Sequence, residues 1–201
     1  MFFMGVYKDQ TAAQRCLSEL KHFYPDEKVV VISDGIPMEG FLTQGADVRV
    51  GSRLKTPNHR GSWTARFLLN FLGTRDSHVI KIDPDTHVNR RVEIPKADIF
   101  SAYRYSNGKR ILAGPAIGFS RKAAMMIMLS GFLYDSKYSA GEYAYHRFYP
   151  PRLKEGEEQS HELVSLQDDI STDVVNRLNI ETLEWSDISL TDPSAAFYHS
   201  L

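Results

Sequence analysis

Apolar runs that end in polar turn residues alternate with segments of helical spacing in the first part of the chain. Residues 2–7 and 28–32 are nearly continuous apolar runs, which is typical of strands buried in a parallel sheet. Between them, apolar residues recur at helical spacing over residues 11–22. This strand–helix–strand pattern predicts an α/β sheet whose ligand binds at the carboxyl ends of the strands.

The expected central strand covers residues 79–83, whose apolar positions are β-branched. Pro84 has no N–H group, so the strand should end at Asp83. Asp83 and Asp85 then follow the strand, and two carboxylates one residue apart suit a divalent cation that also holds phosphate oxygens. Asp and Pro are also ordinary turn residues, so a simple turn is the alternative interpretation.

The rest of the pattern predicts a mixed, mostly parallel sheet, because one strand returns from a hairpin. A single domain over residues 1–201 follows, arranged as a Rossmann-like three-layer sandwich of the α/β class, with a flexible loop at about 141–160. The remaining expected elements are strands at 47–50, 97–105 and 110–113, helices at 63–72 (behind an N-cap Ser62), 121–129 and 170–178, and a strand or loop at 180–185.

Composition and charge narrow the class of protein. The 201 residues are 42% hydrophobic, enough for one globular domain with a sizeable core. With 24 basic and 25 acidic residues the formal net charge is −1, which does not favour nucleic acid or an anionic membrane as partner. No apolar run is long enough to span a bilayer, and residues 1–7 lack the features of a signal peptide. The single cysteine, Cys16, fits a reducing compartment, so we expect a cytoplasmic protein.

Three acidic segments and one histidine occur in a defined order along the chain. Asp34 ends a strand, the Asp83-Pro84-Asp85 segment ends the next long strand, an Asp168-Asp169 pair opens a helix, and His199 comes late. This order resembles that of GT-A-fold glycosyltransferases, which use nucleotide sugars. Within it, Ile82-Asp83-Pro84-Asp85 is similar to their metal-binding DxD motif, Asp168-Asp169-Ile170 resembles the acidic motif of inverting members, and Phe197-Tyr198-His199-Ser200 is similar to the histidine segment of the fringe and β3-glycosyltransferase group.

The resemblance implies a metal-dependent enzyme that moves a sugar from a nucleoside-diphosphate sugar, with UDP-sugar favoured, to the hydroxyl of an unidentified acceptor. Inversion at the anomeric carbon is expected. A histidine ligand favours Mn²⁺ over Mg²⁺ as the cofactor. The implied site residues are Asp83, Asp85 and His199 for the metal, Tyr7, Asp34, Arg66 and Asp83 for the nucleotide, and Asp169, with Asp168 beside it, for the general base. Lys55 is an alternative to Arg66 as the cation that contacts phosphate.

The chain also departs from the family pattern. Asp173 stands where the acidic motif usually has glycine, and the disulfides of secreted relatives are missing. A non-catalytic domain that binds a nucleotide sugar or a metal is one alternative function. A phosphatase of the haloacid dehalogenase type is another, although that family has Thr or Val where this chain has His87. Each site residue also has an ordinary structural interpretation: a turn for Asp34, a helix cap for Asp168 or Asp169, a frayed tail for His199 and an exposed helix position for Arg66.

Overall fold

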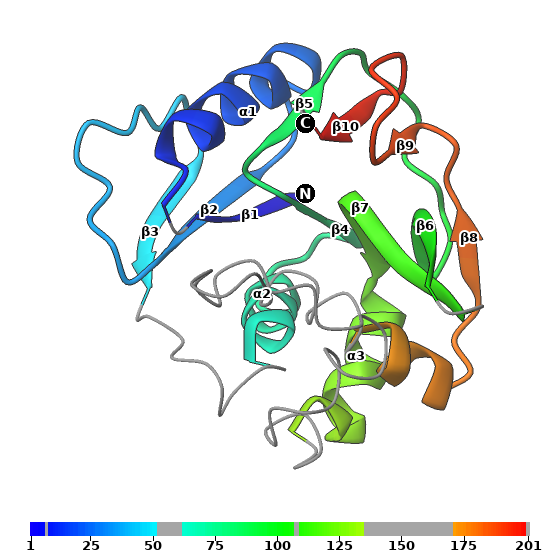
Figure 1. The fold of residues 1–201 in the computed structure, drawn as a ribbon. Helices are drawn as coiled ribbons and strands as arrows, with labels where there is room; N and C mark the ends of the chain where they lie inside the picture. Colours follow the sequence, from blue (N-terminus) through cyan, green and yellow to red (C-terminus); the bar gives the residue numbers. More distant parts are fainter. Residues whose placement is uncertain (7, 52–61, 107–108, 135–170, 200–201) are drawn as a thin grey trace, which may run out of the picture.

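A computed structural model describes residues 1–6, 8–51, 62–106, 109–134 and 171–199. A seven-stranded sheet forms the centre of the molecule, with strand order β3-β2-β1-β4-β7-β6-β8 (Figure 1). β7 runs antiparallel to its neighbours β4 and β6, and the other pairings are parallel. The strands are β1 (Phe2–Val6), β2 (Val29–Asp34), β3 (Asp47–Gly51), β4 (His78–Ile82), β6 (Ile99–Ser106), β7 (Lys109–Ser120) and β8 (Thr182–Glu184).

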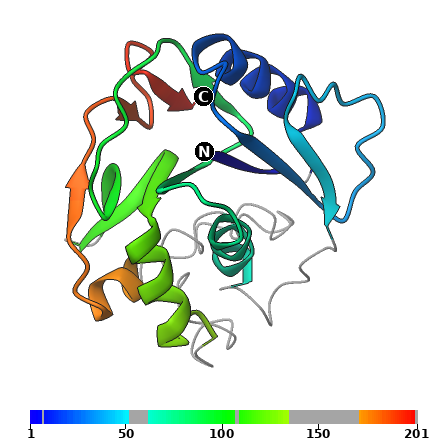
Figure 2. The same ribbon diagram turned by 180° about the vertical axis from the view of Figure 1, so that it is seen from behind.

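Helices cover both faces of this sheet (Figures 1 and 2). α1 (Gln10–Phe23) packs on one face, where its buried positions recur at helical spacing: Ala13, Cys16, Leu17 and Leu20. α2 (Ser62–Leu72), α3 (Arg121–Ser130), the short η1 (Phe132–Tyr134) and the helical residues 171–177 lie on the other face. A hydrophobic core lies on each face of the sheet, and alternate residues of β1 pack into each of them. Phe2 and Met4 face α1, whereas Phe3 faces α2. The expectation of an α/β fold with a mixed, mostly parallel sheet is therefore confirmed.

A second, three-stranded sheet lies over the α1 side of the molecule. It consists of β5 (Thr86–Val88), β10 (Phe197–His199) and β9 (Ile188–Ser189), in the order β5-β10-β9. Phe197 is fully buried against Phe2, Tyr24 and Trp185, and this packing holds β10 to the main core. None of these three strands has a sequence pattern that predicts it. The frayed-tail alternative for His199 is wrong, because this residue belongs to a paired strand.

The central strand ends where the sequence predicted. β4 covers His78–Ile82, and the amide of Asp83 still donates a hydrogen bond of 2.9 Å to the carbonyl of Pro115 on β7. β7 itself differs from the expectation, because it continues through the small residues 114–120 as one long strand. Gly118 makes this possible: a Cβ there would lie 1.9 Å from the ring of Phe100 on the paired strand β6.

No helix among the described residues combines the length and the apolar character needed to cross a bilayer. The expected loop at about 141–160 lies outside the described residues, so it stays a prediction.

Candidate functional site

Asp83, Asp85 and His199 come together at the carboxyl end of β4. Asp83 is the first residue after β4, and the tight turn that follows it is closed by a 3.1 Å hydrogen bond from the Thr86 amide to the Asp83 carbonyl. β5 begins at Thr86, and the register of its pairing with β10 sets His199 opposite Thr86. A histidine near the end of the sequence is thereby brought next to two carboxylates in its middle.

The geometry of this cluster suits a shared metal ion. Nε2 of His199 lies 3.4 Å from Oδ2 of Asp83 and 3.5 Å from Oδ1 of Asp85, and one ligand atom from each residue lies within 4.8 Å of the others. Two ligand atoms that are each about 2.1 Å from one ion, at roughly a right angle, are about 3 Å apart. Nε2 of His199 is also buried without a hydrogen-bond partner among the described residues. A buried ring nitrogen that lies between two carboxylates without a well-formed hydrogen bond to either is an arrangement that a bound cation would satisfy.

Lys81 modifies the charge of this cluster. Its ammonium group forms an ion pair with Oδ1 of Asp83, and both side chains are largely buried. Burial raises the pKa of Asp83, but the positive charges of Lys81 and His199 outweigh it and leave that pKa below its ordinary value. Burial lowers the pKa of His199, whereas Asp83 and Asp85 raise it by a larger amount. In the ion-free protein the cluster therefore favours a protonated His199.

Side chains of α1 hold the turn that carries Asp85. Arg15 donates hydrogen bonds from Nη2 to the carbonyls of Asp85, at 2.8 Å, and Thr86, at 3.4 Å. Glu19 accepts a 2.8 Å hydrogen bond from the Val88 amide and lies 3.2 Å from Nδ1 of His87. This support is not predicted from the sequence. Arg15 and Glu19 are four residues apart on a helix, so they share one face, but the pattern does not reveal which segment that face meets.

A second pair of polar side chains lies at the ends of the neighbouring strands. Nη1 of Arg66 on α2 is 3.4 Å from Oδ1 of Asp34, the last residue of β2, and both side chains are nearly buried. Gly51, which ends β3, leaves room for this contact, because a Cβ there would lie 2.8 Å from the Ser33 carbonyl and 3.2 Å from Nη1 of Arg66. Arg66 is thus not the exposed helix residue of the alternative interpretation. β1 lies between β2 and β4, so Asp34 and Asp83 end strands that are about 10 Å apart.

The structure brings together only part of the predicted site. Asp83, Asp85 and His199 meet, and Asp34 meets Arg66. Tyr7, Lys55, Asp168 and Asp169 lie outside the described residues, so their roles stay predictions.

No protein-family model matches this chain, and no curated protein matches it in sequence. The residues of the site and their geometry are therefore the basis for inferring the function of this protein.

Proposed function

We propose that this protein is a metal-dependent glycosyltransferase that moves a sugar from a nucleoside-diphosphate sugar, with a UDP-sugar favoured, to an acceptor hydroxyl. The observation that carries the proposal is the convergence of Asp83, Asp85 and His199 at the carboxyl end of β4. Ligands of open α/β sheets bind at this edge. The sequence motifs of these three residues predict that they share a metal, although His199 is far from the aspartates in sequence.

The donor set suits the departure of a diphosphate. Half of the Asp85 side chain is exposed, whereas Asp83 and His199 are largely buried, so the cluster has one side open to a ligand. Two carboxylates and one imidazole favour Mn²⁺, and Mg²⁺ is the alternative because it prefers oxygen ligands. When bound, such an ion supplies positive charge that stabilises the leaving diphosphate.

The nucleotide would extend from this cluster toward Asp34. The Arg66 guanidinium holds the Asp34 carboxylate in place from one side. A fixed carboxylate accepts hydrogen bonds from the N–H groups of a nucleobase or from ribose hydroxyls. We assign Asp34 to nucleotide recognition and Arg66 to the positioning of Asp34, with Tyr7 as a further expected contact.

Acceptor activation requires a base that takes the proton of the attacking hydroxyl. We assign this role to Asp169, with Asp168 as its alternative, on the resemblance alone. Proton transfer by a positioned carboxylate contributes about 10²–10⁴-fold to a rate. A single in-line displacement then inverts the configuration at the anomeric carbon.

A second candidate is a domain that binds a nucleotide sugar or a metal without turnover, in which this cluster has a structural role and not a catalytic one. Lys81 and a protonated His199 balance the charges of Asp83 and Asp85, so the cluster is satisfied electrostatically without an ion. Such a network can serve as a structural link between β4 and β10. The two candidates differ in whether sugar transfer releases a nucleoside diphosphate. No contact in the described residues favours the phosphatase.

The test is a thermal-shift panel of UDP, GDP, ADP and CDP, each with Mn²⁺, with Mg²⁺ or with EDTA. A ligand at about 100 times its Kd stabilises the folded state by about 2.7 kcal/mol, which such a measurement detects. We expect stabilisation by one diphosphate, and only with the metal. Release of that diphosphate from a sugar donor then supports the transferase, and binding without release supports the non-catalytic domain. Lack of any nucleotide-dependent shift would contradict the transferase and the nucleotide-sugar-binding domain alike, and would leave only a metal-binding or structural role for the cluster.

A further inference from the structure

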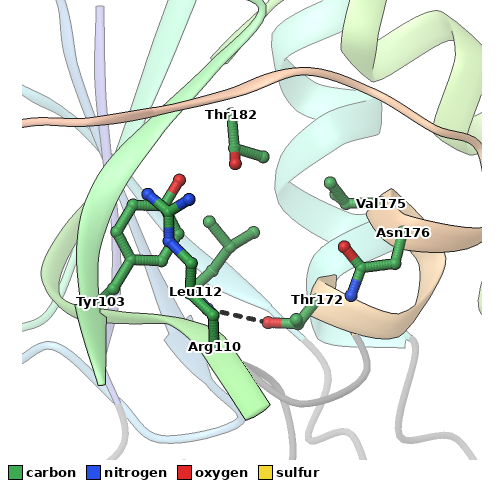
Figure 3. A pocket seen from close by; sticks show the side chains of 7 residues that line it. All are labelled: Tyr103, Arg110, Leu112, Thr172, Val175, Asn176 and Thr182. Atoms are coloured by element: carbon green, nitrogen blue, oxygen red, sulfur yellow. Dashed lines mark hydrogen bonds between the residues drawn. The ribbon is translucent and has the colours of Figure 1, made fainter. Parts of the chain in front are cut away.

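A pocket of about 390 Å³ lies between the β6–β7 hairpin and the helical residues 171–177 (Figure 3). Its walls come from segments far apart in sequence. Tyr103, Arg110 and Leu112 belong to the hairpin, and the other lining residues are Thr172, Val175, Asn176 and, from β8, Thr182. The pocket lies on the face of the main sheet that α2 and α3 cover, whereas β10, which carries His199, lies over the α1 side (Figure 1).

The polar groups of the pocket are those that recognise an anion. Arg110 lies flat on Tyr103, with Cζ 3.4 Å from the ring centroid, and both side chains line the cavity. This stacking uses the face of the guanidinium and leaves its N–H edge for a planar oxyanion. The nearest ion pair of Arg110 is with Glu184 at 3.6 Å, where both side chains are well exposed, so this pair contributes little. Among the described residues that line the pocket, none carries a carboxylate.

The hydroxyl of Tyr103 is the second observation that points to a ligand. Its oxygen is buried and has no hydrogen-bond partner among the described residues. A buried hydroxyl without a partner has lost its hydrogen bonds to water without replacement, so native proteins rarely leave one unsatisfied. In Figure 3 this hydroxyl lies beside the Arg110 guanidinium.

The pocket is also held in shape by the protein itself. The Leu112 amide donates a 3.0 Å hydrogen bond to Oγ1 of Thr172, which ties β7 to the helical residues across the pocket floor (Figure 3). Leu112 and Val175 are buried and supply apolar surface. A preformed, partly apolar cavity with a few convergent polar groups is typical of small-molecule sites, and its volume is at the lower end of their usual range.

We propose that this pocket binds a small organic carboxylate about the size of one sugar ring. Arg110 and the Tyr103 hydroxyl hold the carboxylate, and Thr182 and Asn176 hydrogen-bond to hydroxyl groups on the ring. The proposal does not depend on the metal cluster or on the proposed transferase activity, because none of the pocket residues belongs to either.

The experiment is a ¹H–¹⁵N NMR titration of the full chain in EDTA, which removes metal-dependent binding. The probes are sodium D-glucuronate, neutral D-glucose as its matched counterpart, and sodium phosphate. We expect glucuronate to cause saturable shifts in β6, β7, β8 and residues 171–177, and glucose to cause none. Equal binding of both sugars, or shifts located elsewhere, would overturn the proposal. Lack of binding by glucuronate, including a result in which phosphate alone binds, would overturn it as well.

Three variants locate the binding group. Arg110→Gln should weaken glucuronate binding about 10- to 100-fold, as expected for lost hydrogen bonds to a charged group. Tyr103→Phe removes only the unpartnered hydroxyl, so it should preserve the fold and weaken binding about 2- to 10-fold. The control Arg90→Gln changes an exposed arginine that pairs with Asp187, and it should leave the affinity unchanged. Parent affinity in both pocket variants would contradict the assignment.

Discussion

Nε2 of His199 lies 3.4 Å from Oδ2 of Asp83, although His199 ends β10 of the small sheet and Asp83 follows β4 of the main sheet. Backbone pairing between β5 and β10 produces this contact, because β5 starts immediately after the turn that holds Asp83 and Asp85. The candidate metal centre therefore depends on the small sheet as much as on the large one. A change that separates β10 from β5 should remove one ligand and leave the two carboxylates in place.

Replacing Asp85 tests the metal centre with little risk to folding. Half of its side chain is exposed, and Arg15 contacts its carbonyl and not its carboxylate. We expect Asp85→Ala to abolish Mn²⁺-dependent nucleotide binding, measured by calorimetry, while circular dichroism and the melting temperature stay near those of the parent. The exposed Asp26→Asn serves as the control. Parent affinity for UDP with Mn²⁺ in Asp85→Ala would mean that the metal binds elsewhere.

His199 should make the stability of the ion-free protein depend on pH. Its pKa is raised in the folded state, so its contribution is complete below the ordinary pKa of about 6.5 and is lost as the pH rises through the folded-state pKa. Urea unfolding in EDTA should show the parent losing stability from about pH 6.5 upward. The difference between the parent and His199→Gln should shrink over the same window.

Metal binding should show the opposite trend with pH. Nε2 of His199 coordinates an ion only when it is deprotonated, so the affinity for Mn²⁺ should increase as the pH rises through the same window. In His199→Gln this increase should be absent, whereas the exposed His22→Gln should keep it. A parent protein whose Mn²⁺ affinity does not change across this range would argue against His199 as a ligand.

Arg15 should act as a positioning residue for Asp85. It contacts the turn only through the carbonyls of Asp85 and Thr86, so Arg15→Gln removes support without removing a ligand. Loss of such support commonly weakens metal affinity by about 10- to 100-fold. Calorimetry with Mn²⁺ should show this loss, and the pH dependence of binding should keep its shape because His199 is intact. Arg90→Gln is the matched control, and equal affinities in the two variants would contradict the role of Arg15.

Gly51 should be required for the contact between Arg66 and Asp34. A Cβ at this position would lie 2.8 Å from the Ser33 carbonyl and 2.9 Å from Cγ2 of Ile32, so β3 must move away from β2. Overpacking of this kind destabilises a protein by about 1–3 kcal/mol. We expect Gly51→Ala to lower the urea midpoint and to weaken UDP binding more than Mn²⁺ binding.

The control for this substitution is Gly73→Ala, because its Cβ would only reach ordinary contact distance, 3.5 Å, from the Asn70 carbonyl. Gly73→Ala should bind UDP as the parent does. If Gly51→Ala weakened Mn²⁺ and UDP binding equally, its effect would be general and not confined to the Asp34 end of the site.

Local pattern was sufficient to predict the elements that carry the carboxylates. The β-branched residues Val79, Ile80 and Ile82 and the proline after Asp83 specify a buried strand that ends at Asp83, and the helical spacing in α1 specifies which of its residues are buried. These signals depend on neighbours along the chain, and such neighbours are visible in the sequence. The resemblance of short motifs then suggested a partner for the carboxylates in His199.

Only the tertiary structure decided how these segments meet. β5, β9 and β10 have three, two and three residues, too few for an alternating pattern to appear, and β10 forms because Phe197 is buried in the core. The contacts of Arg15 with Asp85, of Gly51 with Arg66, and of Arg110 with Tyr103 likewise join residues whose proximity has no local signature. The sequence by itself indicated the helices, most strands of the main sheet and the chemistry available at their ends. Long-range packing decided which of those groups share a site, because pairing and burial act between surfaces and not between sequence neighbours.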